Sequence, residues 1–280
     1  MKLSSQCSHI PQDIIDTIID HIEGNHTLKS CAMVSHSFLQ PSQRNLFSVI
    51  HLRGLKLNRL HKLHDILVTK PGISYFIHTL DVVVDGFGMT CVERVDKVLA
   101  RILGMVPCLQ SLSLKFTVPV FWELNLSREF RSALVDLFQS HGLATVHISG
   151  IHEFPLSVLG SFTRIKKLSL DSKFSVAFVP HISLAQLKVL ILRLALQGFD
   201  KTLASAPFSP ISFPNLRRLS IDVYCHSPAF VQSIIASVGS IEYLRWKYHV
   251  LKDNHQWGIY RLFSIDVSIT PTYLFMPNRR

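Results

Sequence analysis

Few residues of this chain combine the types and spacing that chemistry requires. His61 and His64 stand three residues apart with Asp65 beside them, a spacing that could offer two metal ligands on one helix face. Because the chain has 15 histidines, such pairs arise easily, and we interpret this one as part of a solvated surface. His152-Glu153 lacks the second histidine of a zinc-protease helix, and the sequence has neither a phosphate-binding glycine loop nor a nucleophile elbow. We therefore expect no catalytic residue, no metal site and no cofactor.

The cysteines give no chemical site either. There are five, never closer than 17 residues, and no Cys-x-x-Cys pair occurs, which argues against a zinc ribbon or a dithiol redox centre. Reduced thiols fit a reducing compartment. No apolar run approaches the roughly 18 residues of a membrane helix, and the first residues lack the apolar block of a signal peptide. A cytoplasmic or nuclear protein without a membrane partner is the expectation.

The positive charge is unevenly placed. The net charge is +10, but residues 1–50 carry three basic and four acidic side chains, whereas residues 51–280 carry 26 basic and 15 acidic ones. The basic character therefore belongs to the larger, C-terminal part of the chain. With 48% hydrophobic residues, the whole chain has enough apolar mass for a core, so extensive disorder is excluded.

The first fifty residues predict a separate helical module. Pro11 suits the first turn of a helix, and Asp13 complements the helix dipole there. An apolar stripe follows at helical spacing, made by Ile14, Ile15, Ile18, Ile19 and Ile22. A second helix is predicted from about residue 27 to 38, with Pro41 breaking it, and a short third segment covers residues 43–47.

The order of these residues resembles the F-box, a motif that binds a Skp-family adaptor in cullin-based ubiquitin ligases. The similarity rests on I-P-x-D-I-I-x-x-I-I-x-x-I, then L-x-x-C-A-M-V-S-H-S-F, then R-N-L-F. It implies that eight residues build the F-box core or touch the adaptor: Ile10, Pro11, Ile14, Ile18, Leu28, Cys31, Val34 and Phe38. The family commonly has Leu before the proline and Trp at the place of Phe38, so adaptor affinity could be lower here. The alternative is a plain helical hairpin without this role.

A linker helix and a repeat follow the module. Residues 57–68 predict an amphipathic helix with Leu60, Leu63 and Leu67 on one face, within a basic linker over residues 51–75. From residue 76 onward the pattern apolar-x-x-apolar-x-apolar recurs eight times, at intervals of 21 to 34 residues. Its copies begin at Ile77, Leu109, Leu143, Ile165, Leu187, Leu216, Ile241 and Leu262. Helical stripes stand between several copies, for example Val95 to Leu103, Phe130 to Phe138 and Phe230 to Val238.

This pattern resembles leucine-rich repeats. The predicted fold is α/β: an F-box over residues 1–50, the linker helix, and a curved solenoid of parallel strands and helices over residues 76–280. The asparagine that usually follows each repeat strand is missing; Thr117 and Ile151 stand at two of these places, so irregular turns are expected. An ordinary α/β sheet with Leu-rich strands remains the alternative.

The side chains between the template positions are the candidates for binding a target protein, since they should project from the strands toward the concave surface. The basic ones are Lys115, Lys167, Arg193, Arg218, Arg245 and Lys247. The acidic ones are Asp81, Asp171, Asp222 and Asp266. Six to four is no richer in positive charge than the whole repeat region, so no dedicated basic groove is predicted.

The resemblance implies a non-catalytic substrate receptor of a cullin-based ubiquitin ligase, which binds an adaptor through the F-box and an unknown protein target through the repeats. The alternative is a repeat scaffold without a ligase role, which binds acidic partners or nucleic acid. A third possibility is an α/β enzyme, which would show a doubly wound sheet with a cleft where the strand order reverses. A nucleic-acid partner is not expected for the leading interpretation.

Overall fold

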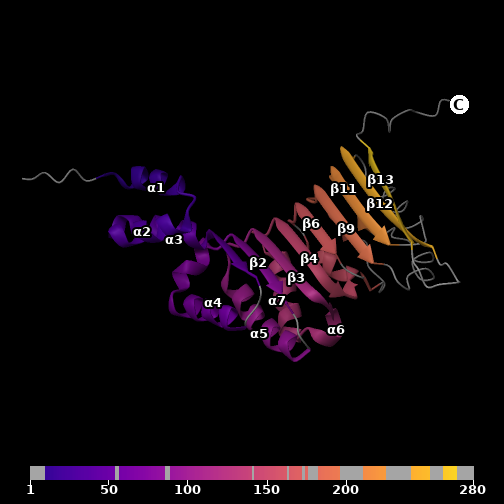
Figure 1. Ribbon diagram of the computed structural model, residues 1–280, viewed down its shortest axis with the longest axis horizontal. Helices are drawn as coiled ribbons and strands as arrows, with labels where there is room; N and C mark the ends of the chain where they lie inside the picture. The colour runs from indigo at the N-terminus through magenta and orange to yellow at the C-terminus, as the bar shows by residue number, and fades with distance from the viewer. Residues whose placement is uncertain are drawn as a thin grey trace, which may run out of the picture.

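A computed structural model describes residues 10–53, 57–85, 89–140, 142–162, 164–171, 174–175, 182–195, 211–224, 241–252 and 261–269. Three helices at the N-terminus form a small module with its own core, in which Ile22, Cys31, Phe38 and Leu46 pack around the buried Ile15, Ile19 and Leu28. The helices are α1 (Gln12–Asp20), α2 (Asn25–Val34) and α3 (His36–Ser48). In Figure 1 this module lies at the end of the molecule where the sheet begins.

The break between the second and third helices differs from the prediction. The chain turns at Ser35, which is extended (φ −159°, ψ 167°), and Phe38 therefore belongs to α3 and not to α2. Pro41 does not end a helix but lies inside α3, in contrast to its predicted role. A proline leaves the carbonyl four residues earlier without its helical donor. Here that carbonyl, on Ser37, accepts a hydrogen bond of 3.0 Å from Gln12 Nε2, which satisfies it and ties α3 to α1.

The rest of the chain is a mixed α/β structure around a parallel sheet of eight strands. The strands stand in sequence order, β1-β2-β3-β4-β6-β9-β11-β12, so the described sheet has no point at which the order reverses. They are β1 (Val49–Leu52), β2 (Thr79–Val84), β3 (Ser111–Phe121), β4 (Thr145–His152), β6 (Lys167–Asp171), β9 (Val189–Ala195), β11 (Arg218–Tyr224) and β12 (Tyr243–Lys252). Figure 1 shows the strands stacked as successive rungs along the long axis of the molecule.

The recurring apolar pattern is the basis of this sheet. In the first six copies all three template side chains are buried, as for Leu109, Leu112 and Leu114. In the copy on β12 only Leu244 is fully buried, and Ile241 and Trp246 pack partly against the core. The last predicted copy is different: β13 (Arg261–Ile269) pairs antiparallel with β12, so it ends the described sheet as an antiparallel strand instead of continuing the parallel series.

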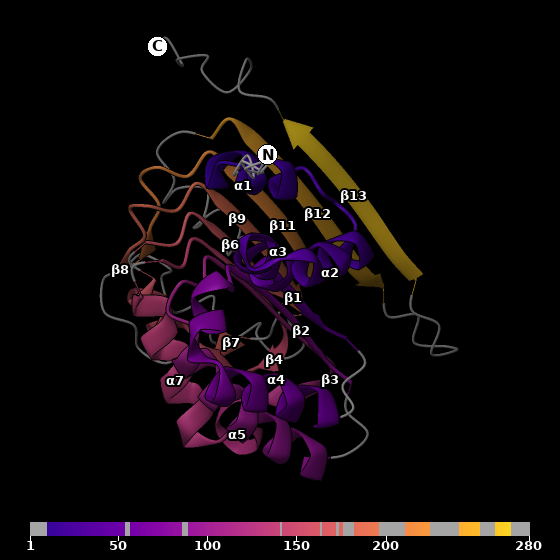
Figure 2. The same ribbon diagram turned by 90° about the vertical axis from the view of Figure 1, so that its left-hand side faces the viewer.

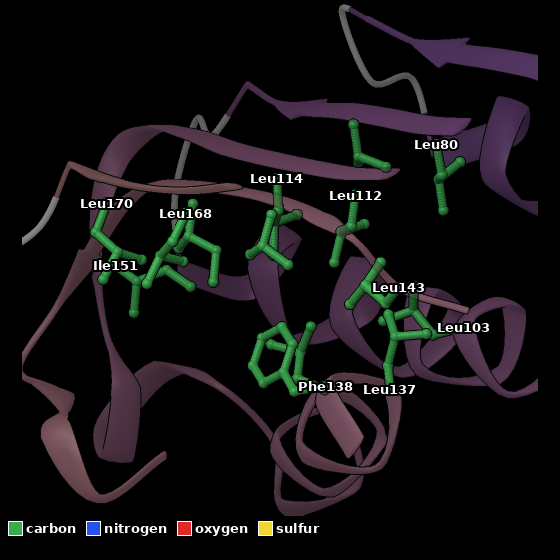
Figure 3. Close-up of a cluster of buried hydrophobic side chains, with 14 of the residues drawn as sticks. Leu80, Leu103, Leu112, Leu114, Leu137, Phe138, Leu143, Ile151, Leu168 and Leu170 are labelled. Carbon is green, nitrogen blue, oxygen red and sulfur yellow. The ribbon is translucent and has the colours of Figure 1, made fainter. Parts of the chain in front are cut away.

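The described helices that follow the N-terminal module lie on one face of the sheet. The covering elements are α4 (Leu57–Thr69), η1 (Pro71–Phe76), α5 (Met89–Met105), α6 (Trp122–Asn125), α7 (Arg128–Gln139) and η2 (Leu156–Ser161). Figure 2 shows α4, α5 and α7 side by side beneath the strands, and Figure 3 shows template leucines of the strands meeting Leu103, Leu137 and Phe138 of this helical layer. The opposite face carries no described helix, and we call it the open face. Short strands at the margin are β5 (Phe154–Pro155), β7 (Phe174–Ser175), β8 (Ile182–Ser183) and β10 (Ile211–Ser212).

The predicted linker packs as the first unit of the sheet. Leu60, Leu63 and Leu67 of α4 are buried in the same core as the strands. The boundary drawn at residue 50 falls within β1, which pairs with β2 through Ile50 and Leu80. The predicted helices around Val95 to Leu103 and Phe130 to Phe138 are present as α5 and α7, whereas that around Phe230 to Val238 lies outside the described residues.

The sheet is irregular at Thr117, one of the places where the asparagine is missing, which lies inside β3. The register between β3 and β4 shifts between Lys115 and Val120. At the place of the asparagine, the Thr117 hydroxyl donates a hydrogen bond of 3.3 Å to the Val84 carbonyl oxygen of the neighbouring strand. Gly150 of β4 lies next to this register shift and has a positive φ of 80°. A Cβ atom at Gly150 would lie 2.2 Å from the Phe116 carbonyl oxygen. Only glycine fits this conformation without strain.

Candidate functional site

The isoleucine stripe of α1 is wider than the surface that covers it. Ile15 and Ile19 are 3% and 0% exposed and face the module core. On the neighbouring side, Ile10, Ile14 and Ile18 are 53%, 48% and 50% exposed. These last three residues form what we call the isoleucine ridge. Large apolar side chains that gather at one place on a surface mark an interaction site more often than single exposed ones do.

The ridge is held in place by polar contacts between α1 and α3. The Arg44 guanidinium lies 3.0 Å from Asp20 and 3.8 Å from Asp16, and Asn45 Nδ2 donates to both the Ile19 carbonyl and Asp20 at 3.1 Å. The hydrogen bonds from Asn45 and Arg44 lower the pKa of the Asp20 carboxyl below its ordinary value, so it stays ionised at neutral pH. These contacts fix the angle of α1 and thus the direction in which the ridge points.

The eight residues predicted for adaptor binding divide into two groups. Exposed side chains form the first: Ile10, Pro11, Ile14, Ile18 and Val34. Inward-facing side chains form the second: Leu28 is buried, and Cys31 and Phe38 pack partly buried against it and its neighbours. Met33, which the sequence pattern did not single out, is 81% exposed beside Val34 on α2. A partner can touch the first group, whereas the second group builds the module.

The six basic residues predicted for target binding all belong to strands of the open face. Lys115, Lys167, Arg193, Arg218 and Arg245 are exposed, and Lys247 is partly exposed. The strand register separates them into rows that run across the sheet. Lys167 and Arg218 share one row with Val189 and Tyr243, while Lys115, Arg193 and Lys247 share another with the carboxylates of Asp171 and Asp222.

A polar cluster occupies the open face at the β1 end. Asp81 Oδ2 lies 3.1 Å from both His51 Nδ1 and Arg53 Nη2. Burial raises the pKa of Asp81, but hydrogen bonds from Ser113, His51 and Arg53 outweigh that effect and lower it below its ordinary value. The carboxylate thus stands between the imidazole and the hydroxyl. In a Ser-His-Asp triad the imidazole stands in the middle, so this order does not activate Ser113 as a nucleophile.

His147 lies at the centre of the open face and is partly buried. Burial lowers its pKa, the carboxylates of Asp171 and Asp81 raise it, and the positive charges of Arg193 and Lys115 lower it, with a net decrease. The imidazole is therefore neutral at pH 7. Asp171 accepts a hydrogen bond of 3.2 Å from the Ser149 hydroxyl.

An open depression of about 560 Å³ lies toward the C-terminal half of the same face. It crosses β6, β9, β11 and β12. Its lining combines two cations with aliphatic, aromatic and hydroxyl groups: Lys167, Val189, Leu190, Ile191, Arg218, Leu219, Ser220, Glu242 and Tyr243. Sequence reasoning found Lys167 and Arg218 but missed Val189, Ile191 and Tyr243. Their signal was present, since each occupies an outward position of a template strand, where an apolar side chain is out of place.

The described residues contain no group of three or more histidine, cysteine or acidic side chains that could hold a metal ion. His64 Nδ1 and Asp65 Oδ1 are 3.5 Å apart on α4, but no further ligand joins them within the described part of the chain. None of the described helices is both long and apolar enough to cross a lipid bilayer. Among the described residues, the isoleucine ridge offers an apolar surface, and the depression on the open face offers a surface of mixed cationic and apolar character.

Comparison with known proteins adds no assignment. The sequence matches no model of a known protein family, and no curated protein is significantly similar to it.

Proposed function

We propose that this chain is the substrate-recognition subunit of a cullin-based ubiquitin ligase. The module of α1, α2 and α3 serves as an F-box and binds a Skp-family adaptor, and the open face of the sheet binds the target protein. The observation that carries the proposal is the isoleucine ridge: three isoleucines, each about half exposed, on a module whose order of residues resembles the F-box. In a helical module without a partner, these three isoleucines would leave a contiguous apolar surface in contact with water.

The ridge supplies a driving force of the right kind for adaptor binding. Burying a whole isoleucine contributes about 1.5–3 kcal/mol, so covering the remaining half of each contributes roughly 0.7–1.5 kcal/mol. The three together contribute roughly 2–4.5 kcal/mol before the costs of association. Met33 and Val34 on α2 offer further exposed apolar surface. A free energy of this magnitude suits one part of a binding surface in a multisubunit assembly.

The connection between the module and the sheet suits a receptor that holds its target in place. Leu46 of α3 packs into the module core, and its neighbour Phe47 packs against the core of the sheet. One helix thus joins both parts without an intervening loop. The order of the described strands is that expected of a solenoid, and they show no reversal of the kind at which doubly wound enzymes bind their substrates. In this scheme the chain performs no bond chemistry and promotes ubiquitin transfer only by holding the target close to the ligase.

Co-purification with a Skp-family adaptor tests the proposal. The intact chain should retain the adaptor, and I14E/I18E should lose it, because each substitution places an unpaired carboxylate in the apolar contact. Ile10→Ala with Pro11→Ala should weaken the complex. I66E/V68E is the matched control, since Ile66 and Val68 are exposed apolar residues of α4.

The control variant should bind the adaptor as the unaltered chain does. Failure of the intact chain to bind any Skp-family adaptor, under conditions in which another F-box protein binds, would refute the proposal and leave the repeat scaffold as the better interpretation. Equal binding of I14E/I18E and the intact chain would refute the role of the ridge.

A further inference from the structure

The depression on the open face has a charge pattern of its own. Lys167 and Arg218 lie in one row, two strands apart, with Val189 on the strand between them. Neither cation forms an ion pair with a described carboxylate. The one acidic side chain of the lining, Glu242, pairs with Arg217 at 3.2 Å. Two positive charges of the depression are thus available to a ligand.

The space between the two cations is apolar. Val189 and Ile191 both project outward from β9, and Tyr243 stands next to Arg218 in the same row. Val189 and Ile191 are partly buried, and the apolar surface that they leave in contact with water favours a ligand that covers it. The pattern of cation, aliphatic surface, cation and aromatic ring is complementary to a ligand with two negative charges around an apolar side chain.

We propose that this depression binds an extended acidic peptide segment of the target, in which two carboxylates flank an aliphatic side chain. The inference rests on the proposed function in that the segment belongs to a protein presented for ubiquitylation. Neighbouring strands are about 4.8 Å apart, so the Cα atoms of Lys167 and Arg218 are roughly 10 Å apart. An extended chain in the polyproline II conformation has three residues per turn and rises about 3.1 Å per residue, so residues i and i+3 point to the same side and span roughly this distance. The segment therefore carries acidic residues at i and i+3 and an aliphatic residue between them.

The same observations disfavour nucleic acid as the occupant. Tight binding to a phosphate backbone uses many cationic contacts, and stacking of bases uses several aromatic rings. The lining of the depression has two cations and one aromatic ring, with aliphatic side chains where bases would stack. Carboxylates match this lining because each can pair with one lysine or arginine by a charge-assisted hydrogen bond.

Fluorescence anisotropy with the full chain tests the proposal. The probe is a labelled peptide with the core Glu-Ala-Ile-Glu between Gly-Ser flanks, compared with its Gln-Ala-Ile-Gln analogue. We expect the glutamate peptide to bind about tenfold more tightly than the glutamine analogue, because two charge-assisted hydrogen bonds are lost in the latter. The variant K167E/R218E should lose about tenfold or more in affinity for the glutamate peptide.

The matched control is K97E/R101E, which makes the same change in net charge on exposed residues of α5, on the helical side of the sheet. It should bind the peptide about as the unaltered chain does, because screening removes most of the long-range effect of surface charges. Adaptor binding is measured on every variant, because the isoleucine ridge lies apart from the depression. Intact adaptor binding by K167E/R218E shows that this variant is folded.

Several outcomes overturn the inference. These are no measurable binding of the glutamate peptide, equal binding of its glutamine analogue, or equal sensitivity of binding to K97E/R101E. A phosphoserine peptide that binds far more tightly than the glutamate peptide, or an oligonucleotide that displaces it, would show a phosphate ligand and would also overturn it. If the unaltered chain binds the adaptor but not the glutamate peptide, this inference alone is refuted, whereas absence of adaptor binding by the unaltered chain refutes the proposed function.

Discussion

Replacing Gly150 by alanine tests the arrangement of the sheet at its least regular point. Gly150 lies in β4 next to the register shift between β3 and β4, with a φ of 80°. A Cβ at this residue would meet the Phe116 carbonyl oxygen at 2.2 Å and the Phe116 Cβ at 3.1 Å. Both the backbone conformation and the lack of space therefore oppose any larger residue.

The size of the effect follows from these two terms. A residue with a Cβ loses about 1–2 kcal/mol in a left-handed conformation. Forcing an extra carbon into a close-packed site costs typically about 1–3 kcal/mol, and here the obstacle is backbone that cannot rotate away. We therefore expect Gly150→Ala to lower the free energy of unfolding by roughly 2–5 kcal/mol, a large part of the usual stability of a domain.

Urea denaturation followed by circular dichroism measures this change. The control is Gly104→Ala, the same chemical change near the end of α5, where an added Cβ meets nothing within 4 Å. That variant should be neutral or more stable by up to about 1 kcal/mol, because alanine loses less backbone entropy in a helix. A Gly150→Ala protein as stable as the unaltered chain would refute the register shift and the packing derived from it.

Three further predictions concern single residues. Ile19→Ala should destabilise the module by about 2–5 kcal/mol because Ile19 is fully buried, whereas Ile18→Ala should change the thermal stability little. Equal effects of the two variants in thermal denaturation would contradict the division of the isoleucine stripe into a buried and an exposed side. Asp96→Ala should lower the free energy of unfolding by about 1–3 kcal/mol, because the buried Asp96 side chain accepts a 2.6 Å hydrogen bond from the Ser127 amide just before α7. An unchanged midpoint of urea denaturation would contradict this role of Asp96. Burial lowers the pKa of His147 below 6.5, so the unfolded chain binds a proton more readily than the folded one. The stability that the neutral His147 imidazole contributes is therefore complete above pH 6.5 and is lost as the pH falls through the folded pKa. The melting temperature of His147→Gln should depend less on pH over this range than that of the unaltered chain.

The parallel sheet was predictable because its signal is repeated. Each strand alternates buried and exposed residues, and the buried ones have to be apolar, so the spacing of leucines is visible in the sequence. The first strand was missed although Phe47, Ile50 and Leu52 fit the same template. These residues directly follow the helical motif, and Phe47 was assigned to that motif, so the template was not recognised there. The copy beginning at Leu262 fits the template too, but the pattern carries no information on strand direction, which only the pairing with β12 reveals.

The binding surfaces were only partly predictable, since hydrophobic periodicity gives the width of an apolar stripe but not how much of it is covered. Ile14 and Ile15 look alike in sequence, and only the packing of α2 and α3 separates them. Charge counting had the same weakness. It averaged over the whole open face, where six basic residues stand against four acidic ones, as in the rest of the repeat region. The register places Lys167 and Arg218 in one row around an aliphatic surface, a segregation that appears only when the strands are aligned.

Isothermal titration of the full chain with a Skp-family adaptor tests the proposed receptor role most directly. We expect saturable one-to-one binding with a negative change in heat capacity, because the ridge of Ile10, Ile14 and Ile18 passes from water into an apolar contact. The variant I14E/I18E should give no binding heat. Absence of binding by the intact chain, with an adaptor that binds another F-box protein, or equal binding by I14E/I18E, would contradict the proposed role.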